Sequence, residues 1–236
     1  MKKLIQVSAA LAASLATPAL AADLPVKAPV APVVAPYNWT GFYVGANLGG
    51  AWGKTQYTDP LAPAGVANTF NTDPDGFIGG GQVGLNYQIG PWVFGVEGEF
   101  SWSNLRGSGR GPVTPPAGST LDTDANWIAT AAGRVGYASD RWLFYVKGGA
   151  AWINVDHSFS NIGPPAFTTS VRETHNGWTV GTGIEWAFAR TWSAKVEYDY
   201  MDFGPDSLVF SALGFPFLLD VKQQIHAVKF GVNYRL

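Results

Sequence analysis

The 236-residue chain has no cysteine, little charge and no long hydrophobic run. Without cysteine, no disulfide framework can stabilise the fold. Charged residues make up 14% of the chain, against roughly 25% in a typical soluble domain. No apolar stretch reaches the roughly 18 residues that a membrane-spanning helix needs. These absences exclude a disulfide-rich scaffold and a helical membrane protein, and they disfavour an ordinary soluble domain.

The chain is rich in glycine and in aromatic residues, and the spacing of its ten tryptophans is informative. Trp92 and Trp102 are ten residues apart, as are Trp142 and Trp152. Ten residues of a tilted strand climb roughly 25 Å, about the height of the apolar band of an outer-membrane barrel. Indole rings favour the membrane–water interface. The spacing therefore predicts two girdles, one formed by Trp39, Trp92, Trp142, Trp186 and Trp192, the other by Trp52, Trp102, Trp127, Trp152 and Trp178.

The N-terminal region carries an export signal. Lys2 and Lys3 precede an apolar stretch, and a small-residue motif ends at Ala21. This pattern predicts a signal peptide over residues 1–21, cleaved between Ala21 and Ala22. Its removal leaves 13 basic against 17 acidic residues, so we expect no nucleic-acid partner. Residues 22–36 are rich in Pro and Ala and predict an extended spacer, and residues 37–236 form one domain.

Alternating segments in this domain predict an all-β fold of eight strands. The segments lie near 40–52, 77–89, 92–102, 126–138, 142–154, 175–188, 192–202 and 224–236. Short turns alternate with four long connections, at about 53–76, 103–125, 155–174 and 203–223. An even strand number with this alternation is typical of an antiparallel transmembrane β-barrel of the outer membrane. The termini would then lie in the periplasm, and the four long connections would be surface loops.

Charged residues in the middle of the strands share one parity, opposite to the aromatic residues. A lysine or arginine facing lipid at the bilayer midplane would cost about 2–4 kcal/mol, so we expect these charges to face the lumen. An eight-stranded barrel is just wide enough for side chains to fill, and balanced charges favour a plug of ion pairs. A soluble lipocalin-like barrel or sandwich is the alternative, with the two faces exchanged. The predicted lumen residues are Glu97, Glu99, Glu185, Glu197 and Asp199 with Arg134, Lys147, Lys195, Lys229 and Arg235.

Three segments resemble a known family: NWTGFYVGANLGG at 38–50, WVFGVEGE at 92–99 and KFGVNYRL at 229–236. The chain resembles the small outer-membrane β-barrel proteins of α-proteobacteria, the porin-family surface antigens of brucellae and rhizobia, which are distantly OmpA-like and opacity-like. The resemblance implies a structural envelope protein that contacts the lipid bilayer and the barrel-assembly machinery. The family usually ends in Phe, whereas this chain ends in Leu236. Some members resembling it are tethered to peptidoglycan through an N-terminal Ala-Asp, which Ala22-Asp23 matches.

The sequence offers little support for catalysis. The pairs Glu97/Glu99 and Glu197/Asp199 suit ion pairing better than acid–base chemistry. Asp156-His157-Ser158 is the only local nucleophile-type candidate, and neighbouring residues on a loop rarely converge on one atom. The glycines at 79, 81 and 84 match a dinucleotide fingerprint by letter, but they lie in an alternating strand with no helix after them.

We therefore expect a structural protein without enzymatic activity or cofactor, which supports the envelope and presents four loops. A narrow porin for small solutes is the first alternative. A haemin-binding or metal-binding surface is the second, and it rests on His157, His175 and His226, which show no ligand spacing.

Overall fold

The computed structural model describes residues 37–58, 69–110, 120–161, 166–212 and 215–236. The predicted signal peptide, its cleavage site and the spacer at 22–36 lie outside these residues. Within the described residues we find no helix that is long and apolar enough to cross a membrane.

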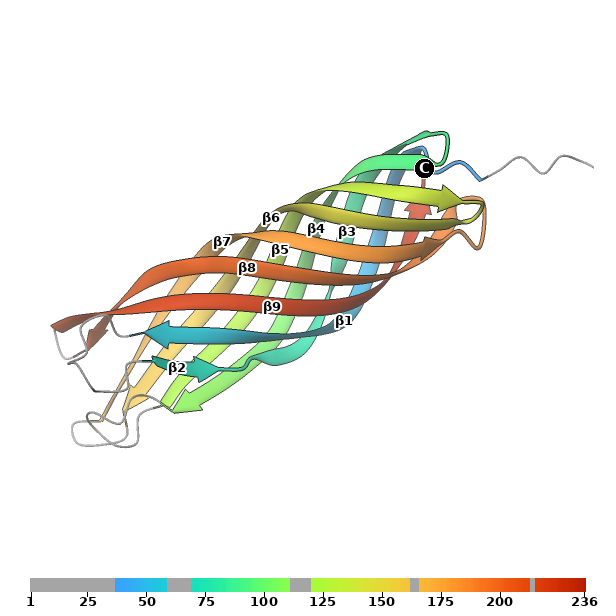
Figure 1. Cartoon of the computed structure of the whole chain (residues 1–236). Helices are drawn as coiled ribbons and strands as arrows, with labels where there is room; N and C mark the ends of the chain where they lie inside the picture. Colours follow the sequence, from blue (N-terminus) through green and yellow to red (C-terminus); the bar gives the residue numbers. More distant parts are fainter. Residues whose placement is uncertain (1–36, 59–68, 111–119, 162–165, 213–214) are drawn as a thin grey trace, which may run out of the picture. The chain divides into compact units, whose positions relative to one another are not determined.

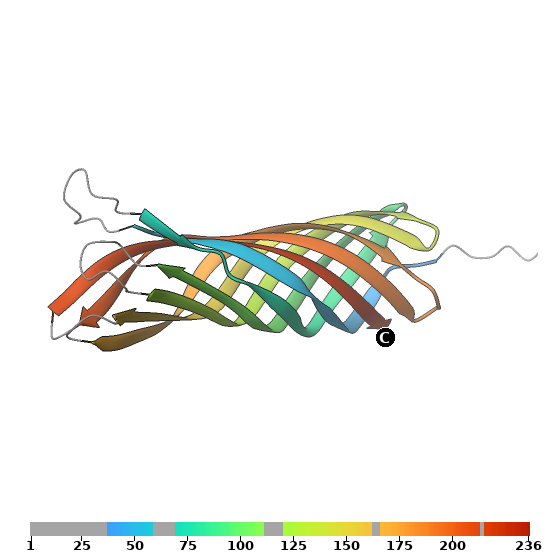
Figure 2. The same ribbon diagram turned by 90° about the horizontal axis from the view of Figure 1, so that it is seen from below.

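The described chain is almost entirely β-strand (Figure 1). All neighbouring strands are antiparallel, and the sheet order is β2-β1-β3-β4-β5-β6-β7-β8-β9. β1 also pairs with β9, from Tyr43 opposite Arg235 to Thr58 opposite Asp220, which closes the sheet into a barrel (Figure 2). The strands are β1 Gly41–Thr58, β2 Thr69–Thr72, β3 Asp75–Ile89, β4 Trp92–Arg110, β5 Thr120–Ser139, β6 Trp142–Asn161, β7 Phe167–Trp186, β8 Trp192–Ala212 and β9 Phe215–Arg235.

The predicted count of eight strands differs from the nine observed among the described residues because of β2. This four-residue strand pairs with the end of β1, on the same edge as β3. Only Asp73 and Pro74 separate β2 from β3, and proline cannot donate a backbone hydrogen bond to a ladder. The Pro74 carbonyl still accepts a 2.8 Å bond from Gly53. β2 and β3 are thus two parts of one interrupted strand, and eight long strands form the ring.

The strands are longer than predicted, so the expected loop boundaries are wrong. Much of each expected loop continues as paired strand, and β8 and β9 remain paired up to Ala212 opposite Phe215. Three of these stretches, at 53–76, 103–125 and 155–174, are rich in polar residues and proline, so the apolar alternation stops there although backbone pairing continues. At the other end, where the C-terminus lies, the turns are short (Figure 1).

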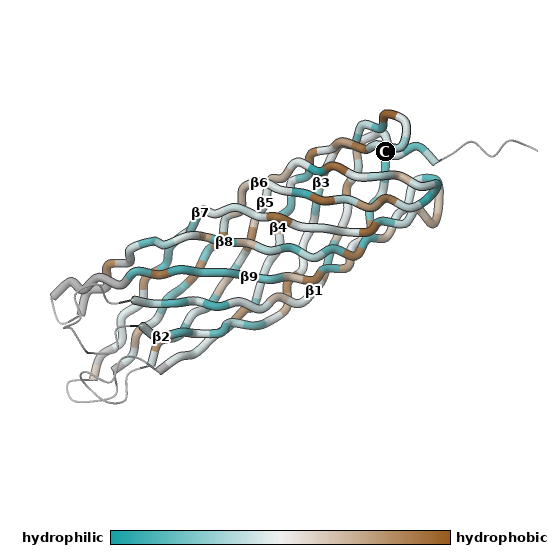
Figure 3. Tube along the Cα trace, in the orientation of Figure 1, coloured by the Kyte–Doolittle hydropathy of each residue, from teal (hydrophilic) through white to brown (hydrophobic). Residues whose placement is uncertain are grey.

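The outer surface changes character along the strands. In the predicted membrane band, large apolar side chains point outward, and Phe94, Val96 and Phe230 are each about half exposed. Beyond Trp102 and Trp152 the outer surface carries ion pairs, between Arg106 and Asp124 at 3.6 Å and between Arg172 and Asp156 at 2.5 Å. Figure 3 shows hydrophobic and hydrophilic residues alternating along the strands, as a wall with two different faces requires.

A β-bulge in β8 changes which residues face inward. The register with β9 shifts between Asp202 and Pro205, where Gly204 has a φ of 64° that favours glycine. Below the bulge the odd-numbered residues of β8 are buried. Above it, Asp206 lies opposite Val221, which is buried in the interior. The bulge therefore brings Asp206 to the inner face.

Candidate functional site

Nine charged side chains meet in the middle of the barrel, and all nine are buried. They come from six strands, which the ring brings together at one level. We call them the lumen network: Glu97 and Glu99 on β4, Arg134 on β5, Lys147 on β6, Glu185 on β7, Lys195, Glu197 and Asp199 on β8, and Lys229 on β9.

Each ammonium group in the lumen network contacts more than one carboxylate. Lys147 Nζ lies 2.6 Å from Glu197 Oε1 and 3.3 Å from oxygens of Glu97 and Asp199. Lys229 Nζ lies 2.6 Å from Glu99 and 2.6 Å from Asp199. Each ammonium group is thus shared between carboxylates of different residues. The network therefore links strands across the lumen as well as neighbouring strands of the sheet.

The network holds five carboxylates and four cations, and neutral side chains also donate hydrogen bonds to several of the carboxylates. Tyr43 donates to Glu97 at 2.8 Å, and Tyr145 donates to Glu197 at 2.5 Å. Glu185 accepts hydrogen bonds from Ser193 at 2.5 Å and from Asn233 at 2.8 Å. Sequence reasoning did not include these donors, although they share the inward parity of the charged residues.

Arg134 lies between two tyrosine rings. Its guanidinium carbon is 4.8 Å from the ring centre of Tyr43 and 4.9 Å from that of Tyr145, within cation–π range. The rings in turn lie against Gly84 and Gly183, where any Cβ atom would overlap the phenol. The two glycines are therefore required for the tyrosines to occupy the lumen.

Two of the residues predicted for these sites lie elsewhere. Arg235 is not in the lumen network: it donates to the carbonyls of Asn38 and Arg190 and stacks over Tyr37 at the barrel mouth. Trp39 is not in a girdle, because it is only 2% exposed and packs with interior residues of that mouth. Trp39 has the same parity as Tyr43, which points inward. The prediction that Trp39 belongs to a girdle was wrong because it used only the position of Trp39 near a strand end.

The other nine tryptophans lie on the outer face. Seven of them are about half exposed, whereas Trp127 and Trp152 are partly covered. Trp142 stacks on Trp186 with ring centres 5.9 Å apart, and Trp127 stacks on Phe100 at 5.7 Å.

Apolar side chains flank the lumen network on both sides. Toward the termini, Trp39, Val93, Leu143, Tyr145 and Ala187 form one buried cluster. Toward the far end, a larger buried cluster includes Leu105, Ile153, Phe203 and Ile225. The charges therefore occupy a polar layer between two apolar layers.

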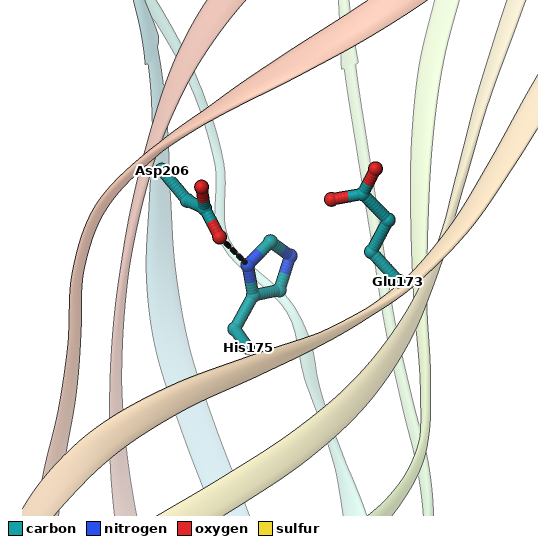
Figure 4. Close-up of side chains that lie close together, drawn as sticks. All are labelled: Glu173, His175 and Asp206. Carbon is teal, nitrogen blue, oxygen red and sulfur yellow. Dashed lines mark hydrogen bonds and ion pairs between the residues drawn. The ribbon is translucent and has the colours of Figure 1, made fainter.

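A second polar group lies beyond the larger apolar cluster. His157 and His175 are buried there, with ring centres 5.8 Å apart, so these two histidines are not scattered. Burial, together with the neighbouring His175, lowers the pKa of His157 to about 4. His175 Nδ1 lies 3.0 Å from Asp206 Oδ2, and Glu173 lies on the opposite side of the imidazole (Figure 4). His226 is separate, because it faces outward and stacks on Trp52 at 5.8 Å.

The geometry does not assemble the catalytic candidates. Asp156 points outward and pairs with Arg172, which lowers the pKa of Asp156, whereas His157 points inward. The carboxylates of the pairs Glu97/Glu99 and Glu197/Asp199 are held by lysines of the lumen network. The glycines at 79, 81 and 84 all lie within β3.

Comparison with known proteins fits this architecture. The family model described as "Outer membrane protein beta-barrel domain" matches residues 7–235. The chain belongs to this family. It is 36% identical over 238 residues to the 31 kDa outer-membrane immunogenic protein of Brucella melitensis, covering 96% of this chain and 97% of that protein. It is 30% identical over 177 residues to the 22 kDa outer membrane protein of Rhizobium leguminosarum, covering 73% and 68%.

The family and these relatives place the chain in the outer membrane. Among solved structures, the outer membrane protease OmpT from Escherichia coli is similar with a TM-score of 0.54, covering 83% of this chain and 97% of that one. The sequence identity is 8%, so this likeness shows the fold alone. The Brucella relatives are named as outer-membrane immunogenic proteins, and the Rhizobium relative as an outer membrane protein.

Proposed function

We propose that this barrel is a structural, non-conducting protein of the outer membrane, which supports the envelope and presents its far end outside the cell. The short turns and the termini would face the periplasm. The connections at the far end would be the surface loops, and the tryptophans of the outer face would mark the two membrane interfaces.

The observation that carries this proposal is the burial of the lumen network between two apolar layers. An ion that entered the lumen would have to displace ammonium and carboxylate groups that already contact each other at 2.6 Å. It would also have to cross apolar layers that offer no replacement for its hydration shell. Shared ion pairs therefore favour a plug over a water-filled pore.

Conductance in a planar bilayer tests the proposal. The folded, full-length mature protein should insert without stable single-channel steps, under conditions in which a known porin conducts. Folding of each preparation is checked by its shifted migration on an unheated gel.

Stable steps would contradict the plug and favour a narrow porin. In that case Lys229→Gln, which changes a buried cation of the lumen, should alter the ion selectivity of the steps. Lys222→Gln, on an exposed position of the same strand, is the matched control.

A further inference from the structure

The second polar group, at the far end of the interior, has unused ligand atoms. Nε2 of His157 and Nε2 of His175 are buried, and neither has a hydrogen-bond partner among the described residues. The side chain of His157 is fully buried, and that of His175 is 4% exposed. Buried nitrogen atoms are normally paired, so two unpaired ones on neighbouring rings point to a missing ligand.

The hydrogen bond at Nδ1 of His175 leaves its Nε2 able to accept. A carboxylate only accepts, so Nδ1 of His175 carries the proton that it shares with Asp206. Nε2 of His175 therefore presents a lone pair. Nδ1 of His157 lies 2.8 Å from the hydroxyl of Tyr57, and either atom can be the donor.

Two carboxylates complete the group. Glu173, His175 and Asp206 each offer a ligand atom within 4.8 Å of the others. In Figure 4 the imidazole of His175 lies between the two carboxylates. Among the described residues, no ion pair joins Glu173 or Asp206 to a lysine or an arginine. Their negative charge is thus available to a cation.

The backbone is built to bring these residues together. The pairing of β7 with β8 ends at Trp178 opposite Asp202, so no backbone ladder joins His175 to β8. The bulge at Gly204 then directs Asp206 inward, where it reaches His175. β-Bulges commonly re-aim a side chain beside a functional site.

We propose that these residues bind one divalent transition-metal ion of the zinc class. Nε2 of His175 and a carboxylate oxygen of Glu173 are the ligands from this group, and Asp206 orients His175 through its Nδ1–H. Imidazole nitrogen and carboxylate oxygen are a donor set that suits zinc, and a carboxylate on the far nitrogen of a ligating histidine is a recurrent arrangement.

The lumen network provides an internal contrast. Glu97, Glu99 and Glu197 also approach one another closely enough to hold a metal ion. Lysine ammonium groups contact all three carboxylates, at distances of 2.6–3.8 Å. These carboxylates are therefore already paired with cations and need no metal ion. At the histidine group no such cation is present among the described residues.

Metal titration of the folded full-length protein tests the proposal. After treatment with a chelator, the protein is titrated with Zn²⁺ by calorimetry and with Co²⁺ by visible absorption. We expect one equivalent to bind and Co²⁺ to develop ligand-field bands. His175→Gln and Glu173→Gln should each weaken binding at least tenfold, and Asp206→Asn should weaken it by about tenfold.

His226→Gln is the matched control, because this histidine lies on the outer face and should leave binding unchanged. Absence of saturable binding by the wild-type protein would overturn the proposal, as would wild-type affinity in His175→Gln. If a variant does not fold, nitrogen NMR of the wild-type imidazoles decides. Zn²⁺ should shift the Nε2 signal of His175 and leave the signals of His226 in place. An unshifted His175 or a shifted His226 refutes the site.

Discussion

The hydroxyl of Tyr145 donates a 2.5 Å hydrogen bond to Oε2 of Glu197, 52 residues further along the chain. The phenol ring of Tyr145 at the same time lies against Gly183 on the neighbouring strand. Tyr43 repeats the arrangement, with Glu97 as acceptor and Gly84 beneath the ring. In both places an aromatic side chain fills the space over a glycine and satisfies a buried carboxylate.

Removing this hydroxyl should destabilise the barrel. In Tyr145→Phe the ring remains, but Glu197 loses a donor in a buried site, which costs about 1–3 kcal/mol. Urea unfolding in detergent or lipid measures the loss. Tyr137→Phe is the control, because Tyr137 lies on the outer face and is half exposed, and it should change stability by less. Equal losses in both variants would contradict the assigned role.

Removing a cation from the lumen network should lower the free energy of unfolding more than removing one from a surface ion pair. Lys147→Met removes one cation that four neighbouring carboxylates share, and such a loss typically costs about 3–5 kcal/mol. Arg106→Gln is the control, because its pair with Asp124 is largely exposed and should be worth less than about 1 kcal/mol. Unfolding free energies of the two variants decide the ranking, and a reversed order would refute it.

A methyl group at Gly183 should be poorly tolerated. The Cβ of Gly183→Ala would overlap the ring of Tyr145, and overpacking of this kind costs about 1–3 kcal/mol. Gly133→Ala is the matched control, since its Cβ meets no atom within 4 Å. Thermal unfolding of both variants is the measurement. If Gly183→Ala is as stable as Gly133→Ala, the close approach of Tyr145 to β7 is not needed.

The terminal residue should affect assembly in the cell. Leu236 is exposed, and its amide donates to the Phe42 carbonyl at 2.9 Å, so the last residue remains in register with β1. Leu236→Phe restores the aromatic end that the family resemblance leads us to expect. The folded fraction in outer-membrane preparations, measured on unheated gels in cells with limiting assembly machinery, should rise. Leu236→Asp is the opposing control and should lower it.

The N-terminus that the expected cleavage would create provides a separate prediction, on residues outside the described structure. If Ala22 is linked to peptidoglycan, muropeptide mass spectrometry should detect a species with Ala22-Asp23 attached to a stem peptide. An Asp23→Lys variant should remove that species. Its absence from the wild-type preparation would show that the spacer is unlinked.

Alternation in the sequence was sufficient to predict the inward face of most strands. Nine of the ten predicted lumen charges lie in one buried network, because residue parity alone decides which face they occupy. Arg235 is the exception among the ten predicted charges. It is the last residue of β9, at the barrel mouth, where its long side chain reaches backbone carbonyls.

The histidine group could not be predicted in this way. His157 and His175 are on different strands, and their proximity depends on a register in which His175 lies opposite Ile153. Asp206 also has the parity of the outer face until the bulge at Gly204 reverses it. Neither the register nor the bulge can be seen from alternation within a single strand.

The pairing of β1 with β9 has a consequence for how the protein is made. The edge of β1 that pairs with β9 has no partner until β9 has been synthesised. A sheet that lacks β9 would therefore have two open edges, on β1 and on β8. An unpaired strand edge is a template for aggregation. A nascent chain that stops before β9 should therefore depend on chaperones throughout its passage to the membrane, and completion of the ring is the step that ends this dependence.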